Sequence, residues 1–584
     1  KAAETFRGQM TAWEFWNEQD IGFAVEAAWD YAAALKAAYL GFKAADPELP
    51  VAIGGYAITP ILPYADVVMK NGAGEYFDIF SVHTYRPISE FPAALRSIRS
   101  HLERFGAADR PIWFTENGSN MEGAGRADGL LPGLKAHSPE QEMLIAEYLP
   151  KMMVIMQFLG VSRDFFFVLP PYNESGGNKD WGLMRRDFSV KPGYAAFATL
   201  VDQLGGAVPE GEVRLGEKLR GFLYRRRDGG KTLVCWSRSE LDTEKPRPNL
   251  TVTGLGEQTF ALPPGGNPAG VDLFGTPFAV DPARVVVTRY PQFLTGVDHL
   301  KADIPFRFPA AAVRPAETEG IDKTVVFRTE LSDDFRLFVG RDCADVKKAG
   351  ARLRLQVWNL SDRAKRGRVA VSGGACAGLP ESVVLPPFGR TELKLAFTPE
   401  LDGEFKGELR ADGVFDGRRA TPLVIPLQSL AEMNSSGRKV EMPQMLDPEN
   451  WRRNAAGTME IRYDENDRAI RFETKFPTGA NRWSYPEYTL QLPQESLEGA
   501  IGIGFEAKVS KPSAVLQMLL MAVPEKGKDV YLKSDAPDGE FREHFIAFPP
   551  GLDAGGIRKL RLGVNALEDE ISVSVRNIRI FYGR

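Results

Sequence analysis

Residues 13–18 read Trp-Glu-Phe-Trp-Asn-Glu, and residues 112–117 read Ile-Trp-Phe-Thr-Glu-Asn. Each stretch is a short run of aromatic and β-branched residues, which favours a buried β-strand. Each run also contains a glutamate next to an asparagine, and the chain becomes polar after it. In a β/α barrel the C-terminal ends of the strands line the mouth of the barrel. The two stretches therefore predict that Glu18 and Glu116 face one shared site.

The first 205 residues alternate strand-like runs with helical patterns, which is typical of a parallel α/β arrangement. Five strand–helix units can be counted, whereas a closed (β/α)8 barrel has eight. We interpret residues 1–205 as the fourth to eighth units of a partial (β/α)8 barrel, although five units could also form a smaller open sheet. A missing N-terminal barrel segment is therefore an expected partner, either from a longer chain or from another polypeptide. The expected strands are 11–16, 51–54, 77–82, 111–115 and 164–169, and the expected helices are 23–45, 61–72, 91–105, 138–159 and 192–204.

After Gly206 the pattern changes to short strands separated by Gly, Pro and Asp turns, which indicates all-β domains. We expect three β-sandwich domains, namely a β-sandwich over 206–300, an immunoglobulin-like β-sandwich over 301–427 and a jelly roll over 428–584. The jelly roll contains aromatic residues that could stack on sugar rings, although aromatic residues in a sandwich more often belong to the core. These residues are Trp451, Trp483, Tyr485 and Tyr531.

The composition is that of an ordinary globular protein, with 43% hydrophobic and 26% charged residues in a chain of 584. The net charge of -5 does not provide the basic surface of a nucleic-acid-binding or membrane-binding protein, so neither partner is expected. No apolar run approaches the ~20 residues needed to span a bilayer. Three cysteines are too few for a disulfide framework, so unpaired thiols are expected, although Cys343 and Cys376 could pair.

Two carboxylates from different strands are what cleavage of a glycosidic bond requires. In the retaining mechanism, one carboxylic acid protonates the leaving oxygen and one carboxylate attacks the anomeric carbon, the two lying ~5–5.5 Å apart. Trp13, Phe15 and Trp16 supply apolar surroundings for Glu18. The alternative is that each glutamate merely ends a strand as a polar residue. The five histidines show no metal-ligand spacing, and neither a nucleophile elbow nor a Walker loop occurs, so no metal or organic cofactor is expected.

With these motifs the chain resembles the clan A retaining glycoside hydrolases, and most closely their β-xylosidase and α-L-iduronidase branch. The resemblance covers about 200 residues and implies a (β/α)8 barrel. Trp-Asn-Glu after the fourth strand matches the acid/base motif at Glu18, and Thr-Glu-Asn after the seventh matches the nucleophile motif at Glu116. By the same resemblance Asn17 binds the sugar 2-hydroxyl, and the His83-Thr84-Tyr85 element places its tyrosine near the nucleophile.

The sequence departs from that pattern in two places. The first three strands, which supply sugar-binding polar residues in this family, are absent. The eighth strand ends without the tryptophan that many relatives place there, and Tyr172 or Trp181 could replace its stacking or simply pack. Tyr85 can donate a hydrogen bond that keeps a carboxylate ionised. His83 could orient Glu18 or a sugar hydroxyl, or it could be a core histidine bonded to the backbone.

The leading hypothesis is a retaining glycoside hydrolase that acts on an oligosaccharide or polysaccharide. The alternative is a catalytically inactive carbohydrate-binding or scaffold protein, which the absence of three strands would favour for this chain alone. The family resemblance also favours a secreted or periplasmic location.

Overall fold

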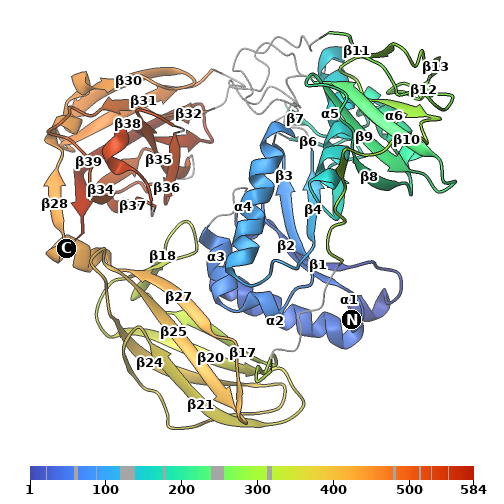
Figure 1. Cartoon of the computed structure of the whole chain (residues 1–584). Coiled ribbons are helices and arrows are strands. Elements are labelled where there is room, and N and C mark those ends of the chain that lie inside the picture. The colour runs from blue at the N-terminus through green and yellow to red at the C-terminus, as the bar shows by residue number, and fades with distance from the viewer. Residues whose placement is uncertain are drawn as a thin grey trace. The chain divides into compact units, whose positions relative to one another are not determined.

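The computed structural model describes residues 1–21, 23–57, 63–86, 88–118, 138–174, 179–238, 256–311, 319–477, 482–511, 515–527, 529–549 and 551–583. The chain forms two compact units, each built from several stretches of sequence (Figure 1). Unit 1 comprises Lys1–Ala24, Ala38–Leu62 and Gly74–Ala316. Unit 2 comprises Val25–Ala37, Pro63–Ala73 and Glu317–Arg584.

Five parallel strands form the sheet of unit 1, and they are the five that the sequence predicts. Registered pairs join the first strand to the second, the third to the fourth and the fourth to the fifth. The bridges Ala52–Ile79 and Tyr56–Val82 join the second strand to the third. The sheet order is therefore the chain order. The strands are β1 (Trp13–Asn17), β2 (Val51–Gly55), β3 (Phe80–Thr84), β4 (Ile112–Asn117) and β5 (Arg163–Phe166).

The central strands β2 and β3 are buried along their whole length, whereas the edge strands β1 and β5 are partly exposed. Trp16 on β1 is 50% exposed and Phe165 on β5 is 46% exposed. In the part of the chain that the structure describes, β1 and β5 each pair with one other strand. The chain is thus an open α/β sheet followed by several β-sheets.

Helices alternate with these strands as expected, and the first long helix begins five residues later than predicted. Helix α5 begins where the Ser138 hydroxyl accepts a hydrogen bond from the Gln141 amide at 3.2 Å. The helices are α1 (Ala2–Thr5), α2 (Ala28–Ala45), α3 (Pro63–Lys70), α4 (Phe91–Arg104), α5 (Pro139–Phe158) and α6 (Pro192–Leu204). Short 3-10 turns are η1 (Ala73–Glu75) and η2 (Ile88–Glu90), and a two-stranded ribbon joins β6 (Asn173–Glu174) to β7 (Lys179–Asp180).

A seven-stranded antiparallel sheet and a separate two-stranded sheet complete unit 1, and Arg289 connects this part of the unit to α5. Glu147 on α5 binds Lys151 at 2.8 Å and Arg289 at 2.6 Å. Strands β9 and β10 pair antiparallel as a hairpin. The strands are β8 (Val208–Glu212), β9 (Leu219–Arg225), β10 (Lys231–Ser237), β11 (Gln258–Phe260), β12 (Ala269–Val271), β13 (Pro277–Ala279), β14 (Val285–Val287), β15 (Gln292–Thr295) and β16 (Ile304–Pro305).

The first sandwich of unit 2 pairs one sheet in the order β17-β20-β24-β22 with a second in the order β18-β19-β27-β25-β21-β23. The segment 63–73 belongs to the same unit because Asn71 exchanges two hydrogen bonds of 2.9 Å with the backbone of Val424. The strands are β17 (Val325–Leu331), β18 (Phe335–Leu337), β19 (Ala344–Val346), β20 (Ala351–Asn359), β21 (Lys365–Ser372), β22 (Gly374–Ala377), β23 (Val383–Leu385), β24 (Arg390–Pro399), β25 (Lys406–Phe415), β26 (Arg418–Arg419) and β27 (Leu423–Gln428).

The second sandwich of unit 2 follows α7 (Leu430–Ser436) and packs two antiparallel sheets around one apolar core. The sheet orders are β30-β31-β39-β34-β37 and β29-β33-β38-β35-β36, with β28 on β39 and β32 on β38. The 3-10 turns are η5 (Pro443–Leu446), η6 (Pro448–Asn450) and η8 (Ala554–Gly556). The strands are β28 (Arg438–Glu441), β29 (Trp451–Arg452), β30 (Thr458–Asp464), β31 (Ala469–Lys475), β32 (Trp483–Ser484), β33 (Glu487–Thr489), β34 (Ala500–Val509), β35 (Val515–Pro524), β36 (Val530–Ser534), β37 (Arg542–Ala547), β38 (Ile557–Ala566) and β39 (Glu570–Tyr582).

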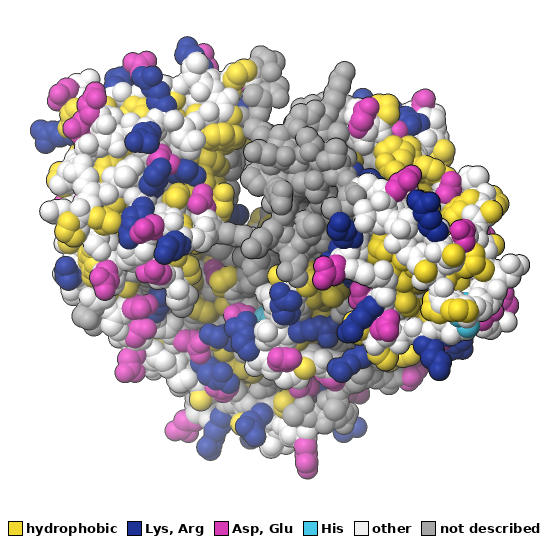
Figure 2. Space-filling model, turned by 45° about the horizontal axis from the view of Figure 1, so that its top comes forward, with side chains coloured by type: hydrophobic (Ala, Val, Ile, Leu, Met, Phe, Trp, Pro, Cys, Tyr) yellow, Lys and Arg dark blue, Asp and Glu magenta, His cyan; other side chains and the backbone are white. Residues whose placement is uncertain are grey.

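The charges on the surface are mixed in sign (Figure 2), as the small net charge indicates, and the three cysteines are unpaired. Figure 2 shows basic and acidic side chains interspersed on the face in view. Cys235, Cys343 and Cys376 are free thiols. Among the described residues, no helix combines the length and the apolar character that crossing a membrane would demand.

Candidate active site

Glu18 directly follows β1, where the backbone leaves the usual strand conformation. Trp16 has a φ of 75° and Glu18 a φ of 47°, both in the left-handed region that non-glycine residues rarely adopt. The amide of Glu18 donates to the carbonyl of Gly55 at 2.9 Å, which fixes this turn to the end of β2. Strained backbone of this kind is concentrated at functional sites. The side chain of Glu18 is largely buried.

Glu116 comes from the end of β4, and Tyr85 follows β3 on the neighbouring strand. The Tyr85 hydroxyl donates a hydrogen bond to Oε1 of Glu116. Gly118 makes room for the tyrosine, since a Cβ there would lie 2.9 Å from Cε1 of Tyr85. One oxygen of Glu116 is thereby held, and Oε2 remains on the side of the other site residues.

His83 lies between the two glutamates. Its Nδ1 is 2.8 Å from Oε1 of Glu18 and 3.7 Å from Oε2 of Glu116. One ring nitrogen of His83 and one carboxylate oxygen from each of Glu18 and Glu116 all lie within 4.8 Å of one another. The imidazole is buried, and Gly55 accommodates it, because a Cβ at that position would be 2.2 Å from Nε2. The structure thus brings together four residues that the sequence singles out.

The position of His83 perturbs its titration. Burial by itself lowers the pKa of His83, but the hydrogen bond to Glu18 and the negative charges of Glu116, Glu18 and Glu14 outweigh it, so that the pKa of His83 is raised above 6.5. An imidazolium in this place carries a hydrogen on Nδ1, which Glu18 accepts. The site can therefore hold an extra proton on the His83–Glu18 pair.

A second layer of polar side chains lies in the same strands and was not predicted. Oε1 of Glu14 accepts hydrogen bonds from the hydroxyls of Ser81 at 2.6 Å and Thr115 at 2.9 Å. These bonds tie together β1, β3 and β4, the strands that lead to Glu18, to His83 and to Glu116. A carboxylate in the middle of an aromatic strand was the available signal, because such a position is seldom charged without a partner.

Asn117 and Asp164 form a polar pair beside Glu116. Nδ2 of Asn117 donates to Oδ1 of Asp164 at 3.0 Å, whereas Oδ2 of Asp164 is buried and has no hydrogen-bond partner among the described residues. Burial raises the pKa of Asp164 to about 7, and the hydrogen bond from Asn117 offsets only part of the effect. The pair fixes the end of β4 against β5.

The remaining predicted site residues lie at different distances from this centre. Trp181 packs edge-on against Tyr85, with ring centroids 4.6 Å apart, and it is buried. Tyr172 is exposed and reaches the same aromatic group through Phe167, at 5.2 Å. Asn17 is exposed on β1 opposite Gly55, and among the described residues it makes no hydrogen bond to Glu18 or Glu116.

The same trio could also chelate a divalent cation, which the histidine spacing in the sequence does not suggest. Two carboxylates and an imidazole within 4.8 Å are suitable ligands for such an ion. Glu18, His83 and Glu116 therefore have two chemical uses that an experiment must separate.

No protein-family model matches this chain, and no curated protein matches it either. Solved structures resemble parts of it. A family 39 glycoside hydrolase from Bacteroides cellulosilyticus is 18% identical over 50% of this chain and 60% of its own, with a TM-score of 0.38. A glucosidase from Croceicoccus marinus is 16% identical over 49% of this chain and 68% of its own, also with a TM-score of 0.38.

A third structure resembles a smaller part. The family 11 carbohydrate-binding module of a cellulosomal cellulase from Clostridium thermocellum is 16% identical over 26% of this chain and 97% of its own, with a TM-score of 0.20. The structural neighbours are thus glycoside hydrolases and a carbohydrate-binding module, and the chain spans less than two thirds of the first of them. The assignment of function depends on the site itself.

Proposed function

We propose that the α/β part of this chain is the catalytic part of a retaining glycoside hydrolase acting on an oligosaccharide or polysaccharide. The observation that supports the proposal is the separation of Glu18 and Glu116, whose nearest ligand oxygens are no more than 4.8 Å apart. Retaining enzymes hold their carboxyl groups ~5–5.5 Å apart, whereas inverting enzymes need ~6.5–9.5 Å to admit a water molecule. The geometry therefore favours retention.

In the first step, Oε2 of Glu116 attacks the anomeric carbon while Glu18 gives its proton to the glycosidic oxygen, which leaves with the bonding electron pair. A covalent glycosyl ester on Glu116 results. In the second step, Glu18 removes a proton from water, the water oxygen attacks the anomeric carbon and Glu116 departs as a carboxylate. No cofactor is consumed.

The neighbours of the two glutamates suit these roles. Tyr85 donates to Oε1 of Glu116, which favours the ionised form that a nucleophile needs and leaves Oε2 for attack. His83 can pass its Nδ1 proton to Oε1 of Glu18 across their 2.8 Å contact, so that Glu18 carries the proton that the leaving oxygen requires. Asn17 and the exposed Tyr172 are proposed to contact the sugar, and Trp181 to support Tyr85 from behind.

We further propose that β1 to β5 are the fourth to eighth strands of a (β/α)8 barrel. The exposed aromatic side chains of Trp16 and Phe165 on the two edge strands support this, because further barrel strands would pair there and cover them. A segment carrying three more strand–helix units is the partner that this proposal requires.

The test is a pair of substitutions that should affect turnover in different ways. Glu116→Gln should abolish turnover of every substrate. Glu18→Ala should spare aryl glycosides with good leaving groups, which need no protonation, and azide should restore turnover as a glycosyl azide of retained configuration. Turnover should be measured on a panel of nitrophenyl glycosides, with and without the segment that completes the barrel. Equal and mild losses from both substitutions would contradict the assigned roles.

A second candidate is a catalytically inactive carbohydrate-binding protein, which the partly exposed edge strands of the sheet favour. A 2-deoxy-2-fluoroglycosyl fluoride separates the two candidates, since only a retaining nucleophile accumulates a covalent adduct. Mass spectrometry of peptides should locate that adduct on Glu116. A protein that binds sugars but never forms the adduct would be the inactive candidate.

A further inference from the structure

One outer face of the jelly roll combines aromatic rings with amide side chains. The pairing of β32, β38, β35 and β36 decides which side chains share this face. Trp483 lies opposite Asn565, and Asn565 lies opposite Gln517. Two further rows follow on the same face, while the alternate residues of β38 point into the core. The further rows are Gly563, Leu519 and Lys533, then Arg561, Met521 and Tyr531.

The aromatic rings surround an apolar floor. The rings of Trp483 and Tyr485 lie nearly parallel, 16° apart, with centroids at 5.6 Å. Tyr531 lies on the same face, on the edge strand β36, and is 63% exposed. Leu519 and Met521 are buried although they belong to the outer face. Trp483 and Tyr485 are half-buried, so parts of all three rings reach the surface. Aromatic rings that reach the surface beside apolar side chains are typical of binding surfaces.

Glycine at position 563 lets the segment that carries Tyr485 lie against β38. A Cβ at Gly563 would lie 1.9 Å from the carbonyl oxygen of Ser484 and 2.7 Å from both Cα and Cδ1 of Tyr485, so only glycine lets this segment and its tyrosine ring lie over β38. The Tyr485 hydroxyl is oriented by a hydrogen bond to Asn565. The ring is therefore held in place before any ligand arrives.

The charges on this face compensate one another. Arg561 binds Glu487 at 2.9 Å and Asp529 at 3.1 Å, and Lys559 binds Glu487 at 2.7 Å. A strongly anionic ligand would have to compete with these carboxylates for the cations. A neutral ligand with many hydroxyl groups can instead accept and donate hydrogen bonds at the margins of the pairs.

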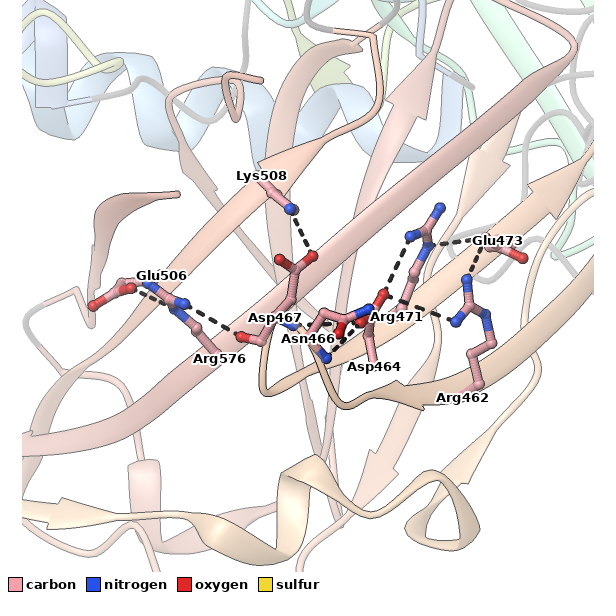
Figure 3. Close-up of polar contacts among 9 residues, drawn as sticks. All are labelled: Arg462, Asp464, Asn466, Asp467, Arg471, Glu473, Glu506, Lys508 and Arg576. Atoms are coloured by element: carbon pink, nitrogen blue, oxygen red, sulfur yellow. Dashed lines mark hydrogen bonds and ion pairs between the residues drawn. The ribbon is translucent and has the colours of Figure 1, made fainter. Parts of the chain in front are cut away.

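The outer face of the other sheet has a different character (Figure 3). It carries interleaved ion pairs, and the ring of Phe541 lies against the cationic groups of Lys508 and Arg576. Arg471 bridges Asp464 and Glu473, Lys508 binds Asp467 and Arg576 binds Glu506. These charges satisfy each other across the strands, so the described part of that face is dominated by ion pairs.

We propose that the face formed by Trp483, Tyr485, Tyr531, Asn565 and Gln517 binds a neutral polysaccharide chain. The apolar C–H faces of pyranose rings would stack on the three aromatic rings, and the sugar hydroxyls would bind the two amides. This inference goes beyond the proposed hydrolase and does not depend on it, because binding here needs no contribution from Glu18 or Glu116.

The test uses the whole chain with Glu116→Gln, which prevents turnover of the probes. Isothermal titration calorimetry should measure the Kd of cellohexaose, xylohexaose, mannohexaose and laminarihexaose, with oligogalacturonate as the anionic probe. Trp483→Ala and Tyr531→Ala are then compared with Tyr463→Ala, an exposed tyrosine on β30 of the other sheet. Removing Tyr531 leaves the core intact because the ring is mostly exposed.

We expect at least one neutral hexaose to bind at one site per chain. Its Kd should rise about tenfold or more in both face variants, as for aromatic anchors elsewhere, and change less than about twofold in Tyr463→Ala. The inference is overturned if no neutral hexaose binds, if only oligogalacturonate binds, or if the face variants bind as tightly as Tyr463→Ala. If the chain with Glu116 intact binds a neutral hexaose at this face but hydrolyses none of the probes, only the proposed enzyme is contradicted.

Discussion

Replacing Gly55 with alanine should disable the site by displacing His83. A Cβ built at Gly55 lies 2.2 Å from Nε2 and 2.6 Å from Cδ2 of His83, and 3.0 Å from Oγ1 of Thr115. Carbon atoms in van der Waals contact keep about 3.5 Å or more, so the imidazole must move by about 1 Å. The backbone can accept alanine here, because the φ of Gly55 is not positive.

The displacement acts on the hydrogen bond between His83 and Glu18. That bond is 2.8 Å long and would be broken or stretched by a movement of this size. A misplacement of about 1 Å in a catalytic group can cost about a hundredfold in rate, and we expect a loss in kcat of that order. The pKa of His83 should also fall, because burial remains while the hydrogen bond that raises it weakens.

The matched control is Gly41→Ala on α2, where a Cβ meets nothing within 4 Å. Both variants should be compared with the parent chain by kcat on an aryl glycoside and by NMR titration of the histidine Hε1 signals. Circular dichroism checks that both are folded. The reasoning is refuted if Gly55→Ala retains kcat within threefold of Gly41→Ala, or if the pKa of His83 is unchanged.

Three further predictions concern the surroundings of the glutamates. Glu14→Ala should lower kcat by about tenfold with little change in KM, because Ser81 and Thr115 lose their common hydrogen-bond acceptor. Glu14→Gln keeps an amide oxygen at that place, so its kcat should stay within about threefold of that of the parent chain. A raised pKa of about 7 for Asp164, against an ordinary 3.8, means that its ionisation destabilises the fold progressively as pH rises from about 4 to 7, by up to about 4 kcal/mol. Asp164→Asn should therefore raise the unfolding temperature more at pH 8 than at pH 5, and an equal gain at both would refute the assignment. Dialysis against EDTA should leave hydrolysis unchanged if Glu18 and Glu116 act as proposed, whereas loss of activity that a divalent cation restores would assign the trio to a metal.

The sequence by itself determined the order and type of the main elements. Alternating apolar strands and amphipathic helices depend on local periodicity, so the five strands and their helices were placed within a few residues of their observed bounds. It also singled out Glu18 and Glu116 as a candidate pair facing one site, because the C-terminal ends of parallel barrel strands lie together at the barrel mouth. The predicted and observed strands differ by a few residues at their ends. Strand β5, expected over 164–169, ends at Phe166, and the amide of Phe167 then donates to the carbonyl of Asn117.

Only the tertiary structure decided what surrounds those two glutamates. Residues 14, 55, 81, 83 and 115 belong to four strands, and nothing in their local sequence says that Glu14 binds Ser81 and Thr115 or that His83 fills the space beside Gly55. The same holds for the face around Gly563, where cross-strand register places an indole and two phenols on one surface. Such contacts depend on how strands distant in sequence are aligned, and alignment is fixed by packing of the whole sheet rather than by any one segment.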